Sequence, residues 1–256
     1  MMEMIRNSGK ITLEICAGSY DSALAALRGG AQRIELCAAL GEGGLTPSWG
    51  LMKAVMALPA LRKHVLIRPR GGDFLYSEAE VRLMTDDILM AREAGADGIV
   101  VGALTADGDV DVRAMCFFME AAGPMSVTFH RAFDLCRDPE ETLERIVELG
   151  CSRLLTSGQA ATAFAGIPLL KRLVELVSGR LSVMPGCGVT ADNAARIVQA
   201  TGAVEIHASA RRPFTSDMNF RHDGVSMGRP SNDEYERWET SEDEVGKIIS
   251  ALDSSL

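Results

Sequence analysis

The chain has 256 residues, of which 47% are hydrophobic and 24% charged, a composition typical of a soluble globular protein with a sizeable core. Its formal net charge of −9 argues against nucleic acid or an anionic membrane as a partner, because phosphate groups repel such a surface. The N-terminal stretch MMEMIRNSGK lacks the apolar segment of a signal peptide, and no apolar run approaches about 18 residues. We therefore expect a cytoplasmic protein whose six dispersed cysteines are free thiols.

Short aliphatic stretches alternate with helical patterns along most of the chain. Four segments, at residues 28–37, 93–102, 148–158 and 200–210, share a helix-ending glycine followed by an aliphatic strand. The predicted strands are 11–18, 33–39, 64–70, 98–104, 126–133, 153–158, 181–188 and 204–210. Eight such units favour a closed (β/α)8 barrel over a doubly wound sheet, since no GxGxxG follows the first strand. We predict a single TIM-barrel domain over residues 1–256, with the barrel at about 11–210.

Local signals also predict where some helices begin. Thr46 and Pro47 form an N-cap and N1 pair for the second helix, and Thr190 is expected to cap the helix after the seventh strand. In the C-terminal extension, 211–256, the polar and aperiodic first part predicts a loop over one barrel end or an oligomer contact. Ser241 with Glu244 then predicts a capping box that opens an amphipathic helix.

Several predicted strands carry charged or polar residues. These side chains cannot point outward, because helices cover the outer face of the barrel. Alternation places them on the interior: Glu14, Glu35, Arg68, Arg70, Thr128, His130, Glu205 and His207. One interpretation is a self-neutralising structural network. The other is a site at the C-terminal mouth of the barrel, where barrel enzymes hold their catalytic groups. For the site, the catalytic candidates are Glu14, Glu35, Arg68, His130, Glu205 and His207.

The pattern Glu-aliphatic-Cys-Ala occurs at residues 14–17 and again at residues 35–38. We expect the two patterns to form the same rung of two adjacent barrel strands, so that Glu14 lies beside Glu35 and Cys16 beside Cys37, all facing inward. Paired thiols would suit Cu(I), whereas the carboxylates and histidines suit a hard metal or acid/base chemistry.

Other residues predict an anion-binding role at the mouth. Arg68 and Arg70 could clamp an anionic group together with the glycine-containing loop after the seventh strand. The anion-binding candidates are Arg70, Thr156, Ser157, Gly186, Gly188 and Ser209. A tight turn that merely needs glycine explains Gly186 and Gly188 equally well. We expect no lysine on a strand, which argues against Schiff-base aldolase chemistry.

These motifs together resemble the CutC family, named copper homeostasis proteins. The resemblance runs from LEICAGSYDSALAALRGGAQRIELCAALGEGGLTPS through IRPRGGDFLYS, VTFHRAFD, LLTSGQ, GCGV and VEIHASA to GVSMG, roughly residues 12–228. It implies a cytosolic TIM barrel that forms a homo-oligomer, a dimer or tetramer. It also implies a link to copper tolerance and a Cu(I) role for Cys16 and Cys37.

The sequence therefore supports two main hypotheses. The first is a copper homeostasis protein of the CutC type that binds Cu(I) through thiols at the barrel mouth. The alternative is a barrel enzyme that acts on a small metabolite bearing phosphate or carboxylate. The expected partner is accordingly a metal ion or a small anion. A purely structural or partner-binding barrel is a third class.

Overall fold

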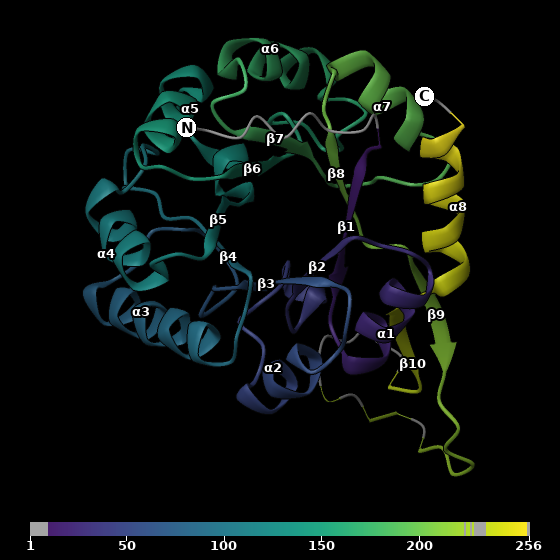
Figure 1. Ribbon diagram of the computed structural model, residues 1–256. Helices are drawn as coiled ribbons and strands as arrows, with labels where there is room; N and C mark the ends of the chain where they lie inside the picture. Colours follow the sequence, from purple (N-terminus) through teal and green to yellow (C-terminus); the bar gives the residue numbers. More distant parts are fainter. Residues whose placement is uncertain (1–9, 223, 226, 228–233, 255–256) are drawn as a thin grey trace.

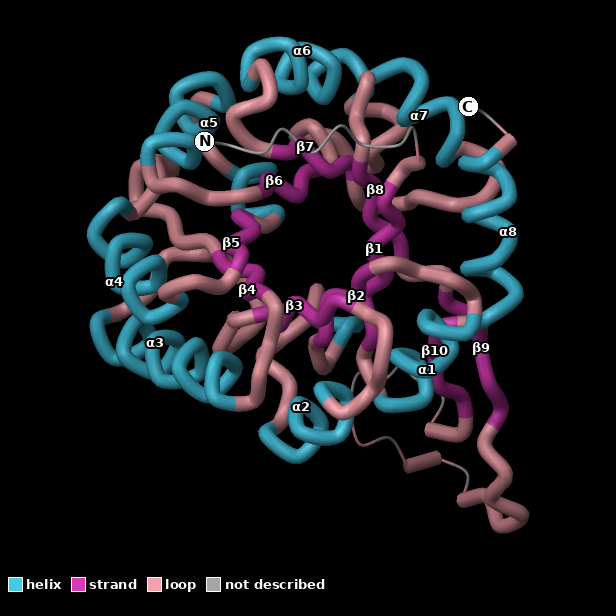
Figure 2. The backbone as a smooth tube through the Cα atoms, viewed as in Figure 1, coloured by secondary structure: helices cyan, strands magenta, loops and turns pink. Residues whose placement is uncertain are grey.

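Eight parallel strands form a ring in the computed structural model, which describes residues 10–222, 224, 225, 227 and 234–254 (Figure 2). The strands are β1 (Thr12–Ala17), β2 (Arg33–Leu36), β3 (Arg62–Leu66), β4 (Gly98–Val101), β5 (Ser126–Phe129), β6 (Arg153–Thr156), β7 (Ser182–Pro185) and β8 (Glu205–Ala208). They pair in the order β7-β6-β5-β4-β3-β2-β1-β8, and the ring closes where β8 meets β7.

Helices surround the ring and alternate with its strands (Figure 1). They are α1 (Tyr20–Arg28), α2 (Trp49–Met56), α3 (Glu78–Glu93), α4 (Val112–Ala122), α5 (Pro139–Glu148), α6 (Ile167–Val177), α7 (Ala194–Thr201) and α8 (Glu242–Asp253), with short 3-10 turns η1 (Leu40–Glu42) and η2 (Arg131–Leu135). The predicted TIM-barrel fold is confirmed. Its main apolar core lies between strands and helices, where parallel strands bury their outer faces. No helix in the described part of the chain is long and apolar enough to cross a membrane.

Two predicted helix starts are wrong by a few residues. The second helix begins at Trp49, and Ser48 caps it by accepting a hydrogen bond from the Leu51 N–H. Thr46 instead ties its hydroxyl to the Arg68 backbone, where it accepts from the N–H at 3.0 Å. After β7 the helix begins at Ala194 rather than at Thr190. Ser48 thus takes the capping role predicted for Thr46, whereas Asn193, which precedes Ala194, makes no side-chain capping bond and accepts instead from the Thr190 N–H at 2.9 Å.

The C-terminal extension is more ordered than its polar composition predicts. Strands β9 (Arg211–Thr215) and β10 (Glu236–Thr240) form an antiparallel ribbon that projects from the ring beside α1 (Figure 1). Helix α8 then packs against α1 and α7. Ser241 precedes it as expected, but its side chain makes no capping bond, and Glu244 pairs with Lys247 and Arg212. The predicted capping box is therefore wrong, because Glu244 has cationic partners nearby.

The register between β1 and β2 differs from the expected one by two residues. Glu14 is opposite Arg33, and Cys16 is opposite Glu35. The expectation that like residues share a rung is therefore wrong. Adjacent strands of a closed barrel are staggered along the barrel axis, so equal sequence positions do not lie side by side. This stagger places a thiol next to a carboxylate.

The expectation that no strand carries lysine is also wrong. Lys63 lies on β3, one residue before His64, and the two side chains point to opposite faces. Its Nζ donates to the Leu58 carbonyl outside the strand ring, at the end of the barrel where strands begin. Lys63 is thus remote from the mouth, and it gives no support to Schiff-base chemistry there.

Candidate functional site

A pocket of about 360 Å³ lies at the C-terminal ends of the strands. The predicted site residues that line it are Cys16, Glu35, Arg68, His130, Gly188, His207 and Ser209. They come from or directly follow β1, β2, β3, β5, β7 and β8. The remaining candidates lie either deeper in the barrel or on the loops around it.

Glu14 and Glu205 lie below the pocket in a buried network with two arginines. Arg33 donates to both carboxylates, and Arg153 donates to Glu205. Burial alone would raise the pKa of each carboxyl group, but the guanidinium groups hold both pKa values below the ordinary range. Two carboxylates and two guanidiniums neutralise one another here. The interpretation as a structural network therefore describes this lower layer of the interior.

Glu14 also connects this network to the mouth through His207. Its Oε1 lies 2.8 Å from His207 Nδ1. Because Glu14 is ionised, Nδ1 carries a proton and donates it to Glu14. The other ring nitrogen, Nε2, lies on the side of Glu35 and Cys16. Burial would lower the pKa of His207, but its hydrogen bonds to Cys16 and Glu14 and the charge of Glu35 raise that pKa well above its usual value.

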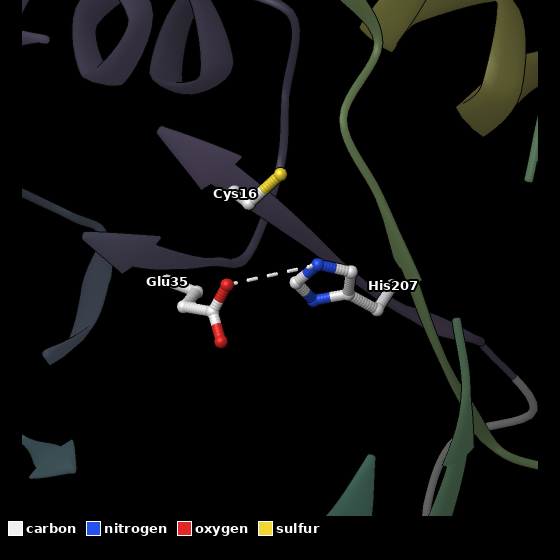
Figure 3. A group of neighbouring side chains, drawn as sticks. All are labelled: Cys16, Glu35 and His207. Atoms are coloured by element: carbon white, nitrogen blue, oxygen red, sulfur yellow. Dashed lines mark ion pairs between the residues drawn. The ribbon is translucent and has the colours of Figure 1, made fainter. Parts of the chain in front are cut away.

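Cys16, Glu35 and His207 form a compact group of potential metal ligands (Figure 3). The thiol sulfur, a carboxylate oxygen and a ring nitrogen all lie within 4.8 Å of one another, and the three residues are buried. Glu35 Oε2 lies 3.9 Å from His207 Nε2. Burial raises the pKa of Glu35 to about 7, partly offset by His207 and reinforced by Glu14.

Cys37 lies behind Cys16 rather than in the pocket lining. It is fully buried in a small cluster with Cys16, Leu66 and Val100. Its thiol donates to the Ala17 carbonyl at 3.6 Å. Burial raises the pKa of Cys37 well above the ordinary value for a thiol, and the nearby Cys16 and Glu35 raise it further. A thiolate at this position is therefore costly.

Arg68 and His130 form the opposite wall of the pocket. The Arg68 guanidinium stacks over Phe74, 5.0 Å from the ring centre, and donates to the carbonyls of Glu42, Gly44 and Gly72. The His130 ring packs on the same Phe74, with ring centres 4.8 Å apart. Arg68 thus holds the loops around the mouth as well as lining it.

Arg70 is turned away from the mouth. It pairs with Glu80 at 2.6 Å and Asp73 at 3.2 Å, and its guanidinium lies over the Tyr76 ring. It does not line the pocket, so the expectation that Arg68 and Arg70 clamp one anion together is wrong. The intervening Pro69 lies beyond the end of β3, where strand alternation no longer determines the direction of side chains.

Thr156 and Ser157 bind a carboxylate that belongs to the protein itself. Both hydroxyls donate to Asp134, and the backbone N–H of Ser157 adds a bond at 3.1 Å. Asp134 in turn holds Arg131 at 2.7 Å, and Arg131 lines the pocket. The two hydroxyls therefore orient an arginine at the mouth through Asp134.

The glycines after β7 have two different roles. A Cβ on Gly186 would lie 2.5 Å from Leu155 Cδ1 and 3.2 Å from His207 Cβ, so this glycine allows β7 to approach its neighbours. Gly188 has φ of +69° and lines the pocket. Between them, Cys187 donates its thiol to the Ala161 carbonyl at 3.3 Å. Close packing thus accounts for Gly186. Gly188 and Ser209 line the pocket and remain candidates for contact with a ligand.

Sequence reasoning missed three buried or half-buried cations of the interior. Arg33 and Arg153 are the first residues of their strands, and Arg211 follows β8 and lines the pocket. It also missed His64, which is buried beside Glu14 and whose pKa burial lowers to about 4. For Arg33 and Arg153 the sequence does carry a signal. Each lies two residues before an inward-facing residue, Glu35 and Leu155 respectively, so strand alternation places it on the same interior face.

Comparisons with a family model and with individual proteins lead to the same family. A family model described as "CutC family" matches residues 11–212. A protein of Bacteroides thetaiotaomicron named "family protein CutC" is 55% identical over 247 residues, covering 96% of this chain and 99% of that protein. The human "Copper homeostasis protein cutC homolog" is 50% identical over 216 residues, covering 84% of this chain and 79% of that protein.

Solved structures agree with the fold. The crystal structure of a putative copper homeostasis protein CutC from Streptococcus agalactiae superposes with a TM-score of 0.74 at 35% identity, covering 77% of this chain and 97% of that one. A thiamine phosphate pyrophosphorylase from Pyrococcus furiosus gives a TM-score of 0.59 at 15% identity, covering 97% of this chain and 98% of that one. The latter similarity concerns the barrel fold alone.

Proposed function

Because the chain belongs to the CutC family, we propose that it acts in copper homeostasis by binding a copper ion at the barrel mouth through Cys16, Glu35 and His207. The observation that carries the proposal is the convergence of the three ligand atoms within 4.8 Å of one another. The names of the human and Streptococcus agalactiae relatives support copper as the ion.

The donor set fits a transition metal. A thiolate and an imidazole are ligands that copper accepts, and a carboxylate completes a three-ligand set with space toward the pocket. The hydrogen bond from His207 Nδ1 to Glu14, at 2.8 Å, is the outer-shell contact that fixes the orientation of a metal-binding histidine. The residues present therefore fit a metal ion.

This site differs from the one that the paired cysteines predict. Cys37 is fully buried and its thiol is bonded to the Ala17 carbonyl, so a second thiolate there would cost more than using His207. Cys16 lines the pocket and lies next to Glu35 and His207. We therefore propose a mixed sulfur, nitrogen and oxygen site for Cu(I), with Cys16 as the thiolate ligand.

Competition titration with a chromophoric Cu(I) chelator under reducing conditions tests the proposal. We expect one copper per chain, with the Kd weakened by at least about 100-fold in Cys16→Ala and His207→Gln, and by about tenfold or more in Glu35→Gln. The matched control is Cys37→Ala, which removes the neighbouring thiol and should leave the Kd within about threefold. Equal losses in Cys37→Ala and Cys16→Ala would favour the two-thiol site, and no stoichiometric binding would refute the proposal.

A second candidate function is catalysis on a small anionic metabolite. The specific observation is the charge around the pocket: among the described residues, its lining includes Arg68, Arg131 and Arg211 but one carboxylate, Glu35. A Glu35 whose pKa is about 7 is well placed to exchange protons near neutral pH. NMR screening of phosphorylated and carboxylated metabolites for conversion tests it. Conversion should be lost in Glu35→Gln, and the absence of any conversion by the wild-type protein would contradict it.

A further inference from the structure

His130 carries a hydrogen-bond donor that its surroundings leave without an acceptor. The residue is 4% exposed and lines the mouth pocket. Its Nδ1 accepts a hydrogen bond from the Ala132 N–H at 3.2 Å, so the ring caps η2. Within the described part of the chain, Nε2 has no hydrogen-bond partner. An unpartnered buried donor is costly, so a ligand that accepts a hydrogen bond from it would bind more tightly.

The tautomer of this ring follows from its contacts. Since Nδ1 accepts, Nε2 must carry the proton of the neutral ring. Burial lowers the pKa of His130 to about 3, and the neighbouring Arg68 contributes in the same direction, so the ring is neutral at physiological pH. The ring packs closely against Gly102, where an added Cβ would come within 2.7 Å of Nδ1, and against the tilted Phe74 ring, with ring centres 4.8 Å apart.

A buried positive charge lies next to this donor. Arg68 is 6% exposed, and its guanidinium also stacks over the Phe74 ring. Its two terminal nitrogens donate to backbone carbonyls, and among the described residues its Nε has no hydrogen-bond partner and no carboxylate lies within ion-pair distance of the guanidinium. A buried charge without a counter-charge is costly, so this wall of the pocket favours an anion.

We propose that the mouth pocket binds a small oxyanion, a phosphate or carboxylate group, that accepts from His130 Nε2–H and faces the Arg68 guanidinium. The inference deepens the second candidate function, on which it rests for its biological use, by naming the ligand class and the residues that hold it. Binding itself requires no metal ion. The subsite lies on the wall formed by the ends of β3 and β5, whereas the metal ligands come from β1, β2 and β8.

Calorimetry and thermal unfolding of the metal-free protein test this subsite. The probes are inorganic phosphate and succinate, compared with chloride at equal ionic strength, and they separate a phosphate ligand from a carboxylate one. We expect saturable binding and a raised Tm with at least one oxyanion. An equal effect of chloride, or binding that occurs only after copper loading, would overturn the proposal, since the anion would then be a screening ion or a metal ligand.

Two substitutions of His130 separate its contacts. Asn in place of His130 keeps an oxygen that accepts from the Ala132 N–H but lacks the Nε2 donor, so His130→Asn should weaken oxyanion binding by about tenfold or more. Gln extends an amide N–H toward the Nε2 position, so His130→Gln should retain more affinity than His130→Asn. Arg180→Gln, an exposed arginine outside the pocket, should bind normally. Oxyanion binding by His130→Asn as tight as that of the wild type would overturn the proposal.

Two further measurements keep the outcomes distinct. Oxyanion binding by the wild-type protein should be unchanged in the presence of an excess of a copper chelator, so failure of the copper site leaves this inference intact. In the wild-type protein labelled with nitrogen-15 at histidine, the Nε2–H resonance of His130 should shift on addition of the oxyanion that binds. Binding without any shift of this resonance would place the anion elsewhere.

Discussion

Glu35 combines a ligand position with an unusual burial. It is 7% exposed, and within the described residues it forms no ion pair with arginine or lysine; its charged neighbour is His207, at 3.9 Å. Burial raises its pKa from 4.5 to about 7. A carboxyl group in this setting is partly protonated at neutral pH, so proton and metal compete for the same oxygen atoms.

This shift predicts a pH dependence of stability for the metal-free protein. Because the folded pKa of Glu35 lies above the unfolded one, its contribution is fully present below about pH 4.5 and is lost as the pH rises through about 7. The loss amounts to roughly 3 kcal/mol. Urea unfolding of wild type and Glu35→Gln at several pH values measures it, and the difference between the two proteins should change by about this amount.

The same comparison removes an opposing effect. Burial lowers the pKa of His64 to about 4 and of His130 to about 3, so their contributions are lost as the pH falls below about 6.5. Both histidines are present in the wild type and in Glu35→Gln, so they cancel in the difference. An identical pH profile for the two proteins would contradict the assigned shift of Glu35.

At the scale of strands, the network beneath the mouth joins three neighbouring elements. Arg33 on β2 donates to Glu14 on β1 and to Glu205 on β8, and its side chain is 2% exposed. Arg33→Met should lower the free energy of unfolding by about 3–5 kcal/mol, because it leaves the buried carboxylate of Glu14 and the half-buried one of Glu205 without that partner. Denaturant unfolding measures the change.

An exposed ion pair provides the control for this prediction. Arg180 donates to both carboxylate oxygens of Glu144 at 2.6 Å, with side-chain exposures of 43% and 48%. Arg180→Met should lower the free energy of unfolding far less than Arg33→Met does, because water screens the pair. Comparable losses of unfolding free energy in Arg33→Met and Arg180→Met would show that burial does not increase the contribution of the Arg33 network to stability.

The elements themselves could be predicted, whereas their register could not. Strands follow from aliphatic runs and glycine helix ends, and Glu35, Arg68, His130 and His207 lie at the mouth as predicted. Parallel strands are joined through helices rather than tight turns, so no local signal fixes their relative shift. The stagger that places Cys16 next to Glu35 is a property of barrel closure.

At the scale of the whole molecule, the ribbon of β9 and β10 extends away from the barrel (Figure 1). Phe214 and Trp238 are 42% and 55% exposed, and their register places them on adjacent rungs that face opposite sides of the ribbon. Phe220, beyond the end of β9, is 71% exposed. Exposed aromatic side chains concentrated on one projection are typical of an interaction surface.

Homo-oligomerisation, which the family resemblance predicts, can therefore be tested at this ribbon. We expect light scattering after size exclusion to give a mass above that of one chain, 27.4 kDa, at micromolar concentration. The double variant Phe220→Ser, Trp238→Ser should raise the dissociation constant by about tenfold or more, because aromatic anchors carry much of the energy of interfaces. Leu83→Ser on α3, where Leu83 is 57% exposed, is the matched control and should associate normally. If the ribbon variant keeps the mass of the wild type at every concentration, another surface must join the copies.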